Sequence, residues 1–388
     1  MSTREKTTGL KKSIRTLFAG IALGALGTLA SAGPLGAPGD IYSVGTDRII
    51  PNFASQVIIQ FDGETGERVG NFVFSNGDVP ILAGQIMGMT WAPNGNLFIS
   101  WHGGGFTNWR IKEYDGQTGL FIQDVIIVEN GNFTIAKGLT FGPDGDLYVG
   151  NFLQANVTRY DGTTWEVKSV TPNDGVMGGP NGIHFAPNGN LMVLSGGFNK
   201  ILEYDVSDGF FTLIGDFGTV PGSVQPQDFT WGPNGNIFVA RGTAGGVAEL
   251  DGTTGAFLGN FIPGDTSLKV NGLVFDNYDR LLTSMIFPLS RVDAYDATTG
   301  AAMGPFLTDG FGVDGSIPTI ITVKPSDSPS ACSAADLAEP FGELNFFDVS
   351  AFLSLFSDGD AAADLTGDGD FNFFDVSAFL SVFSAGCP

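Results

Sequence analysis

Cysteine, histidine and basic side chains are scarce in this chain. Its 388 residues include two cysteines and two histidines, and 18 Lys and Arg stand against 41 Asp and Glu, a formal net charge of −23. With only His102 and His184 present, few options remain for catalysis by histidine. The acidic excess opposes binding to nucleic acid or to anionic lipid through bulk charge. It favours solubility.

Long apolar runs are absent after residue 32. Lys11, Lys12 and Arg15 precede an apolar run at 17–30, and Ala-Ser-Ala at 30–32 is typical of a cleavage site. The run is short for a spanning helix, which needs about 20 apolar residues. We therefore predict that 1–32 is a signal peptide and that the mature protein is exported (periplasmic, cell-surface or extracellular), with no stable membrane span. An uncleaved anchor is the alternative.

Glycine, in contrast, is plentiful, and much of it lies in an internal repeat. The first half of the repeat is Gly-Leu-Thr-Phe-Gly-Pro-Asp-Gly-Asp-Leu-Tyr-Val at 138–149, with copies at 88–97, 182–191, 228–237 and, more loosely, 272–281. Its aromatic anchors are separated by 50, 44, 46 and 44 residues: Trp91, Phe141, Phe185, Trp231 and Phe275. Spacings of about 40–50 residues are typical of the four-stranded blades of a β-propeller.

The second half of the repeat is an Asp-containing turn that follows a strand. It appears six times, at 61–66, 114–119, 160–164, 204–209, 250–255 and 295–300. Asp-Gly supplies the positive φ that tight hairpins need. Segments 57–61 and 156–160, rich in β-branched and aromatic residues, are predicted strands. We interpret these six aspartates as turn residues, since six are too many for one catalytic site.

One first-strand copy is missing, and the two ends of the repeat region supply it. Residues 320–325 fit the motif if one slip is allowed, and 41–44 match its continuation. We therefore predict an all-β six-bladed propeller at 33–325 whose first blade is built from both chain ends, so that strand sharing closes the ring. Such closure removes exposed sheet edges.

A different composition begins after a linker at 326–331. Residues 332–388 contain both cysteines and a duplication, 335–353 and 363–380. Each copy ends in a helical pattern with spacing i, i+3, i+4, i+7. The two apolar stripes, which we expect to pack against each other, are Val349, Phe352, Leu353 and Phe356, and Val376, Phe379, Leu380 and Phe383.

The second copy contains a calcium-loop pattern. Oxygen donors stand at loop positions one, three, five, seven, nine and twelve, namely Asp364, Thr366, Asp368, Asp370, Asn372 and Asp375. Gly369 falls at position six, where the loop must turn sharply. Hard oxygen ligands at this spacing suit Ca²⁺ better than Zn²⁺. An acidic turn before a helix is the alternative.

This tail resembles a dockerin, a duplicated EF-hand-type Ca²⁺ loop plus helix that binds a cohesin on a scaffold or surface protein. Its Cys-Pro ending is similar to dockerin-like tails thought to anchor exported bacterial proteins. The first loop is one residue longer and lacks acidic residues at Ala338, Pro340 and Phe341, so we expect weak Ca²⁺ binding or none there. Phenylalanines replace the usual partner-selecting residues, and we expect them to pack between the copies, with a partner-facing role as the alternative: Phe346, Phe347, Phe373 and Phe374.

Cys332 and Cys387 bracket the duplication. In an exported chain, two such cysteines are most simply a disulfide that joins the ends of a small module. Attachment of Cys387 to a surface component is the alternative.

The propeller repeats resemble those of NHL-type six-bladed propellers, including gluconolactonases and streptogramin lyases. The resemblance implies the fold and says little about chemistry. It places the informative residues at the channel end of each first strand, namely Met87, Lys137, Asn181, Gln227, Asp228, Asn271 and Thr319. In gluconolactonase-like enzymes such a ring holds a divalent metal, but 226–229 carries its acid one place late and no matching early glutamate is present.

Two histidines are the weak catalytic candidates. His184 stands mid-strand where the other copies have Thr or Val, so we interpret it as an interior histidine rather than a base. His102 lies in a glycine-rich segment at 101–106 that we expect to be a flexible loop able to line a pocket, without the Gly-x-Ser-x-Gly elbow of esterases. Streptogramin-lyase chemistry uses histidines late in the chain, and none follows His184.

Two functional hypotheses follow. The first is an exported, non-catalytic propeller that binds a glycan, peptide or protein and is tethered by its calcium-binding tail to a surface or scaffold partner, cohesin-like or other. The second is a hydrolase, lactonase or lyase, assisted by a divalent metal, with its site in the channel and polysaccharide among its candidate substrates. The sequence favours the first.

Overall fold

The structure is a computed structural model. It describes residues 36–46, 56–73, 85–102, 108–128, 135–266, 269–285, 291–307, 320–325, 333–335, 337, 344, 346–358, 363–366 and 369–386. The proposed signal peptide, the linker, Thr319, Asp368, Cys332 and Cys387 lie outside these residues.

Twenty-four strands form six four-stranded antiparallel sheets, which we call blades 1 to 6. Blade 1 consists of β24 (Ile321–Val323), β1 (Ile41–Thr46), β2 (Gln56–Phe61) and β3 (Arg68–Val73). Blade 2 consists of β4 (Gln85–Trp91), β5 (Leu97–His102), β6 (Trp109–Tyr114) and β7 (Phe121–Val128). Blade 3 consists of β8 (Ala136–Phe141), β9 (Leu147–Asn151), β10 (Asn156–Tyr160) and β11 (Val167–Val170).

The remaining blades continue the same order along the chain. Blade 4 consists of β12 (Pro180–Phe185), β13 (Leu191–Ser195), β14 (Lys200–Asp205) and β15 (Thr212–Thr219). Blade 5 consists of β16 (Asp228–Trp231), β17 (Ile237–Ala240), β18 (Val247–Leu250) and β19 (Phe257–Ile262). Blade 6 consists of β20 (Val270–Phe275), β21 (Arg280–Met285), β22 (Arg291–Asp296) and β23 (Ala302–Leu307). The predicted six-bladed propeller is confirmed.

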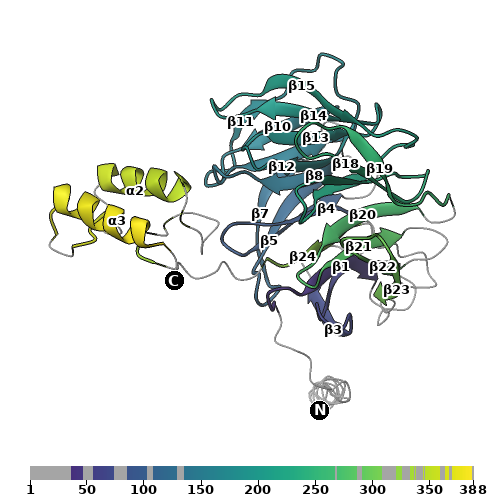
Figure 1. The fold of residues 1–388 in the computed structure, drawn as a ribbon, viewed down its shortest axis with the longest axis horizontal. Coiled ribbons are helices and arrows are strands. Elements are labelled where there is room, and N and C mark those ends of the chain that lie inside the picture. Colours follow the sequence, from purple (N-terminus) through teal and green to yellow (C-terminus); the bar gives the residue numbers. More distant parts are fainter. Residues whose placement is uncertain are drawn as a thin grey trace, which may run out of the picture. The chain divides into compact units, whose positions relative to one another are not determined.

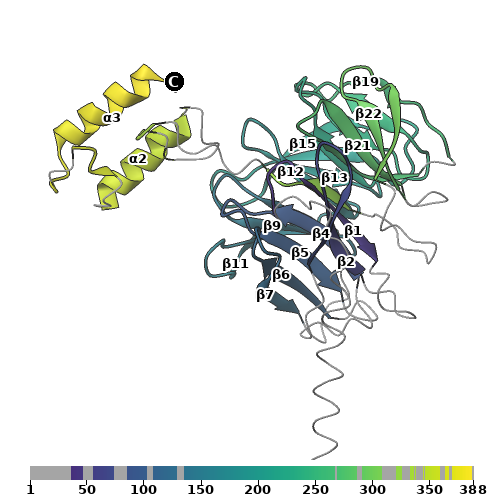
Figure 2. The same cartoon turned by 90° about the horizontal axis from the view of Figure 1, so that it is seen from below.

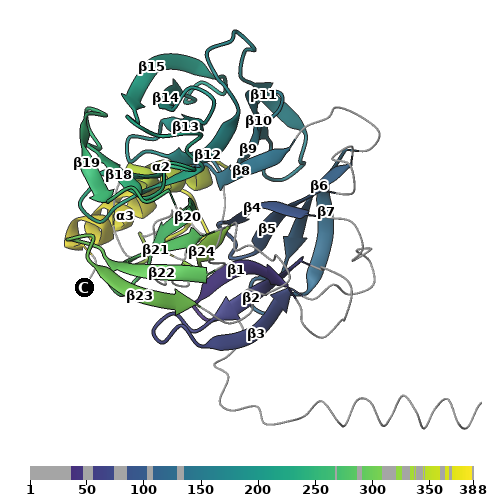
Figure 3. The ribbon, with the colours of Figure 1, turned by 90° about the vertical axis from the view of Figure 1, so that its right-hand side faces the viewer.

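The six blades surround a common centre (Figure 3). Each inner strand contacts the inner strands of both neighbouring blades, so that β24, β4, β8, β12, β16 and β20 form a closed ring. Blade 1 combines both ends of the repeat region, because β24 pairs with β1 through Ile41–Val323 and Tyr42–Thr322. Lys324 extends this junction by donating a backbone hydrogen bond to Asp40 and accepting one from Gly39.

The aromatic anchor of each repeat packs against the second strand of the preceding blade. Trp91 lies edge-on to Tyr42 with ring centroids 4.9 Å apart. Phe141 meets Phe98 in the same way at 5.0 Å. Six apolar clusters formed in this manner fill the spaces between the six pairs of neighbouring blades. The period of the repeat therefore reflects one bulky ring at five of the six interfaces, and Val323 takes that place between blades 6 and 1.

The two turn motifs of a repeat lock together at one end of the blade. In blade 2, Asn96 Oδ1 accepts a hydrogen bond from the Gly116 amide at 3.3 Å, and Asn96 Nδ2 donates to Glu113 at 2.7 Å. A Cβ on Gly116 would lie 1.7 Å from the Gly95 carbonyl oxygen, so only glycine fits there. Blades 4 and 5 contain matching Asn–Glu pairs, Asn190 with Glu203 and Asn236 with Glu249.

The aspartates of the second turn motif are turn residues, as predicted. Asp115 Oδ1, for example, accepts hydrogen bonds from the Thr118 amide and hydroxyl at 2.7 and 2.6 Å. These bonds lower the pKa of Asp115, and the same arrangement lowers the pKa values of Asp62, Asp251 and Asp296.

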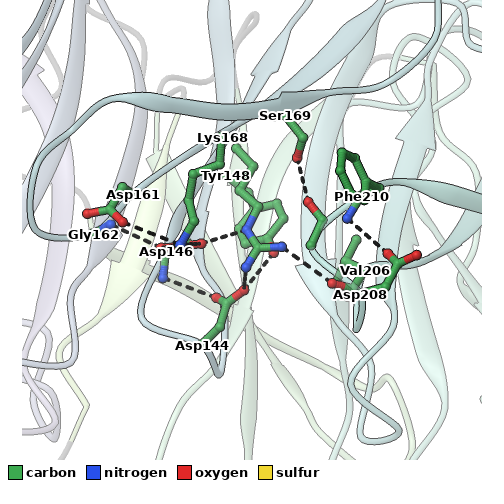
Figure 4. Close-up of polar contacts among 12 residues, drawn as sticks. Asp144, Asp146, Tyr148, Asp161, Gly162, Lys168, Ser169, Val206, Asp208 and Phe210 are labelled. Carbon is green, nitrogen blue, oxygen red and sulfur yellow. Dashed lines mark hydrogen bonds and ion pairs between the residues drawn. The ribbon is translucent and has the colours of Figure 1, made fainter.

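In blade 3, oppositely charged side chains take the place of the Asn–Glu pairs found in blades 2, 4 and 5. Arg159 binds Asp146 at 2.5 Å and Asp144 at 2.7 Å, while Lys168 lies 2.9 Å from Asp146 (Figure 4). Tyr148 also donates to Asp144 at 2.8 Å, and burial raises the pKa of its phenol. Since Arg159 and Asp146 are both buried, this pairing is needed to offset their loss of hydration.

Two helices, α2 (Phe346–Asp358) and α3 (Phe373–Ala385), form the tail and lie side by side (Figures 1 and 2). Phe352 and Phe379 stack with centroids 4.2 Å apart and 12° between their planes. The predicted stripes are confirmed in this contact but wrong for Leu353 and Leu380, which are 56 and 55% exposed. The contact between two helices buries a narrower strip of helix surface than the four residues of each predicted stripe would cover. Among the described residues, no helix has the length and apolar character needed to cross a membrane.

Candidate functional site

A central cavity of about 340 Å³ lies among the six inner strands. All six ring residues predicted within the described part of the chain line it, namely Met87, Lys137, Asn181, Gln227, Asp228 and Asn271. The structure thus brings together side chains from five blades that are up to 184 residues apart in sequence, from Met87 to Asn271. Whether they bind a ligand stays a prediction.

β-Bulges turn these side chains towards the cavity. The pairing register of four inner strands shifts at this position, at Met87, Lys137, Asn181–Gly182 and Asn271. An extra residue in a strand breaks the alternation of faces, so two consecutive residues can face the same side. Both Lys137 and Gly138 accordingly line the cavity.

The residue after the ring position is glycine in most repeats because the inner strands approach closely. A Cβ on Gly88 would lie 2.5 Å from the Lys137 carbonyl oxygen. Asp228 is the exception, and its carboxylate extends over the neighbouring strand, where a Cβ on Gly182 would lie 2.7 Å from Asp228 Oδ1. Close packing of the inner strands favours glycine at this position, so packing does not explain the carboxylate of Asp228.

Lys137 is held by amides from two other blades. Its ammonium donates to Asn181 Oδ1 at 2.9 Å and to Gln227 Oε1 at 2.7 Å. The orientation of both amides is set by their other ends, because Asn181 Nδ2 donates to the Pro226 carbonyl and Gln227 Nε2 to the Gln225 carbonyl, each at 2.6 Å. The Lys137 ammonium is therefore held by two acceptors whose positions are fixed by their own hydrogen bonds.

The enclosure of Lys137 changes its acidity. Burial among the blades lowers the pKa of its ammonium to about 8, and the negative charge of Asp228 opposes this shift. The ammonium also lies 5.5 Å from the centre of the Phe152 ring, a cation–π contact. Two of its three N–H donors are engaged by Asn181 and Gln227, which leaves one for a ligand.

His184 belongs to a second ring deeper in the same strands. Its counterparts in the other repeats also line the cavity: Thr90, Thr140, Thr230, Val274 and Thr322. The side chain of His184 is 38% exposed, and its Nε2 lies 3.6 Å from Asp228 Oδ1. The interpretation of His184 as an interior histidine is wrong, because this face of the inner strand borders the channel and not an interblade core.

His102 is the buried histidine instead. It ends β5, pairs with Gln85 and Trp109, and is 1% exposed. Burial lowers the pKa of its imidazole to about 4, so it is neutral at physiological pH. The expectation that His102 lines a pocket from a flexible loop is wrong, since strand pairing continues through this residue and it does not border the central cavity.

The tail loop of the second repeat forms a hydrogen-bonded unit around Asp364 and Asp375. Asp364 Oδ2 accepts from the Gly369 amide at 2.8 Å, and Gly369 has φ +79° at the sharp turn of the loop. Thr366 Oγ1 lies 3.4 Å from Asp364 Oδ1 and 2.8 Å from Asp375 Oδ1. Oxygen donors from loop positions one, three and twelve are therefore close together, as a hard cation requires.

Asp375 is fully buried and also belongs to the start of α3. Its oxygens accept from the Thr366 amide and the Asn372 amide, each at 3.0 Å, in addition to the Thr366 hydroxyl. These bonds, chiefly the Asn372 amide, lower its pKa. They occupy three of about four lone-pair directions of the carboxylate, so Asp375 can offer a cation one oxygen and not two.

Other donors of the loop are placed less directly. Asn372 caps α3 by accepting from the Phe374 amide at 2.8 Å, and the Asp370 carbonyl accepts from Asn372 Nδ2 at 3.0 Å. Within the part of the chain that the structure describes, no three His, Cys, Asp or Glu side chains form a metal-binding group. Asp368, at loop position five, is not among those residues.

The expected packing of the tail phenylalanines is wrong for the two whose side chains are described. Phe373 and Phe374 are 75 and 67% exposed. Both lie in the first turn of α3, before its buried residues Asp375 and Phe379, and their rings are largely exposed to solvent.

Comparisons with known proteins establish the fold. No family model and no curated protein sequence matches this chain. A chain of a nidogen/laminin complex has a TM-score of 0.55 and 13% identity, covering 74% of this chain and 98% of the other. A protein of unknown function from Bacteroides caccae has a TM-score of 0.50 and 15% identity, with the same coverage. A streptogramin B lyase has a TM-score of 0.46 and 17% identity over 60 and 70%. At 13 and 15% identity, the first two structures support the fold alone.

Proposed function

We propose that this protein is an exported recognition propeller that binds a glycan, peptide or protein group in its central cavity. The observation that carries the proposal is the Lys137–Asn181–Gln227 cluster, in which three blades hold one ammonium in place. Preorganised polar groups in a concave site reduce the entropy lost on binding. A volume of about 340 Å³ is at the lower end of small-molecule sites, so the cavity suits one small group or the end of a larger ligand.

Ligand capture from an array of glycans and peptides tests this proposal. A channel-filling variant, Thr140→Phe, should lose every ligand that the unaltered chain retains, while its thermal unfolding stays close to that of the parent. Thr140 lines the cavity, and the exposed Thr163 lies in a turn, so Thr163→Phe is the matched control. Retention of ligands by the Thr140 variant would place binding outside the channel.

A hydrolase, lactonase or lyase is the second candidate, and the His184–Asp228 pair favours it. The two side chains share the cavity at 3.6 Å, a separation at which substrate binding could form an acid–base hydrogen bond. The metal-assisted form of this hypothesis is less well supported. The Asn181 oxygen already accepts from the Lys137 ammonium, whose charge repels a divalent cation.

Metal content and Ca²⁺ titration calorimetry on residues 33–325 separate the two candidates. Tight, stoichiometric binding would indicate a channel metal and support the enzyme. Mass spectrometry of captured ligands adds a second criterion, since conversion of a ligand by the parent chain but not by His184→Ala would also support an enzyme.

We further propose that the tail binds Ca²⁺ and tethers the protein to a surface or scaffold partner. Asp364, Thr366, Asp368, Asp370, Asn372 and Asp375 supply the ligands, with Asp375 contributing a single oxygen. The exposed pair Phe373–Phe374 supports a partner contact at the beginning of α3. Cleavage after 32 and a Cys332–Cys387 disulfide complete this proposal, and intact-mass measurement with and without reductant tests both.

Calcium binding by the tail has a stability test. Ca²⁺ should raise the unfolding temperature of residues 331–388, and Asp364→Ala should abolish that rise. Asp348→Ala is the matched control, because Asp348 accepts from the Leu337 amide in the first copy, as Asp375 does from Thr366. Asp348→Ala should lower the unfolding temperature of the module, but Ca²⁺ should still raise that temperature. No response in the parent module would refute the calcium proposal.

A further inference from the structure

The central cavity has two chemically different walls. Its polar side chains come mainly from blades 3 to 5, where Lys137, His184 and Asp228 are the titratable ones. On the remaining side, Met87, Val274 and Ile320 from blades 2, 6 and 1 add apolar surface beside Thr90, Asn271 and Thr322 of the same blades. A ligand that fills this space needs a charged or hydrogen-bonding face and an apolar face.

Charge identifies the group that belongs beside Lys137. Among the described residues that line the cavity, Lys137 is the one Lys or Arg, in a chain of net charge −23. Two neutral amides hold it, so no carboxylate within ion-pair distance neutralises it among the described residues. Its third N–H can donate to an anionic oxygen, and a charge-assisted bond in an enclosed site is stronger than a neutral one.

Hydroxyl partners surround the remaining space. Thr90, Thr140, Thr230 and Thr322 contribute four hydroxyls to the deeper ring, and each can donate and accept. Asp228, next to His184, accepts only. This combination complements a ligand that carries several hydroxyls as well as one negative charge.

From this arrangement we infer that the channel binds a sugar acid, with the ligand carboxylate at Lys137 and its hydroxyls at Asp228 and the threonine ring. The inference rests on the proposed binding role of the channel and narrows its ligand to an acidic glycan or the free uronate. The apolar wall at Met87 and Val274 then receives the C–H face of the sugar.

D-Galacturonate and D-galactose are the matched probes, because they differ only at C6. With the full chain, binding by titration calorimetry or ligand-observed NMR should favour the acid by about tenfold or more. Lys137→Met should remove this preference, and methionine already occupies the equivalent position in blade 2. Asp228→Asn should increase the preference, since it removes a negative charge from the same cavity. Lys200→Met, which alters an ion pair with Asp216 outside the cavity, should leave the preference unchanged.

The outcomes separate this inference from the proposed function. Equal binding of both sugars, abolished by Thr140→Phe, would overturn the sugar-acid inference and retain the channel as a binding site. Failure of both sugars to bind would also overturn it, while ligands captured from the array would still support a recognition role. A preference that survives Lys137→Met would show that another group binds the carboxylate.

Discussion

Asp228 and Lys137 show how single residues adapt a repeated framework. Asp228 stands where Gly88, Gly138, Gly182 and Gly272 stand in other repeats, at a point where a side chain has little room. Lys137 occupies a cavity-lining position that is Met, Asn or Gln in the other described repeats. Packing does not require either charge, and the proposed ligand site would account for both.

Anion binding in the channel should depend on the protonation of Lys137. Its pKa of about 8 in the free protein means that the ammonium is present below pH 8 and is lost above it. Galacturonate affinity should therefore fall by up to roughly tenfold per pH unit above pH 8. The other titratable side chains facing this cavity are His184 and Asp228. Titration calorimetry measures the profile, and a decline that persists in Lys137→Met would assign it to another group.

Turn glycines should differ in importance according to what surrounds them. Gly116→Ala should cost roughly 3 kcal/mol or more, because its Cβ would overlap the Gly95 carbonyl. Gly95 has φ +80°, but a Cβ added there would have no described atom within 4 Å, so Gly95→Ala should cost about 1 to 2 kcal/mol. Denaturant unfolding measures both. Equal costs would mean that the two turns are not in close contact.

At the scale of elements, blades 1 to 5 are variations on one hydrogen-bonding plan, whereas in blade 6 Arg280 stands at the bridging position and donates to the Glu64 carbonyl of blade 1. The turn residue that bridges the two hairpins is Asn in blades 2, 4 and 5 and Asp in blades 1 and 3, where Asp40 accepts from Gln60 and Asp146 from Arg159. The partner on the third strand changes with it, so a donor always meets an acceptor. Buried polar groups need such matched pairs because an unpaired one costs about 1–3 kcal/mol.

Charge reversal within blade 3 tests this plan. Arg159→Glu alone places a third carboxylate beside Asp144 and Asp146 and should cost roughly 3–5 kcal/mol. The triple variant Asp144→Asn, Asp146→Asn, Arg159→Glu reproduces the Asn188, Asn190 and Glu203 set of blade 4. It should recover more than half of that loss in denaturant unfolding. A triple variant as unstable as the single one would show that blade 3 depends on its charges for another reason.

For the whole molecule, we expect closure to depend on a three-residue strand. β24 pairs with β1, and Ile321 belongs to the apolar cluster between blades 6 and 1. A chain that stops after 325 should keep the unfolding temperature of the propeller. One that stops after 319 loses β24 and exposes the edge of β1, so it should lose roughly 3 kcal/mol or more and aggregate. Thermal unfolding and light scattering measure this, and equal stability of the two truncations would contradict a closing role for β24.

Much of this architecture can be predicted from sequence. The spacing of Trp91, Phe141, Phe185, Trp231 and Phe275 predicts blades, because an aromatic ring recurs at five of the six interfaces. Turn glycines and aspartates are equally visible, since positive φ and local side-chain bonds depend on near neighbours. The ring positions can be named as well, by counting back from each repeat.

The contacts among those positions cannot be predicted in the same way. Asn181 and Gln227 hold Lys137 across 44 and 90 residues of chain, and the signal for this lies in no single repeat. Sequence patterns place His102 and His184 in the wrong environments, because strand length and the facing of the inner strands decide which imidazole is buried. Similarly, helix periodicity does not distinguish the narrow contact around Phe352 and Phe379 from the exposed Leu353 and Leu380.

The repeat, its turns and the six-bladed fold are specified along the chain, because they depend on local conformational preferences and on burial repeated at a fixed period. Which residues meet at the centre depends instead on how the blades close. Six strands from distant parts of the chain meet there, and bulges in four of them determine which side chains face the cavity. Charges that are unremarkable along the chain, Lys137 and Asp228, become a shared site because closure of the ring encloses them together.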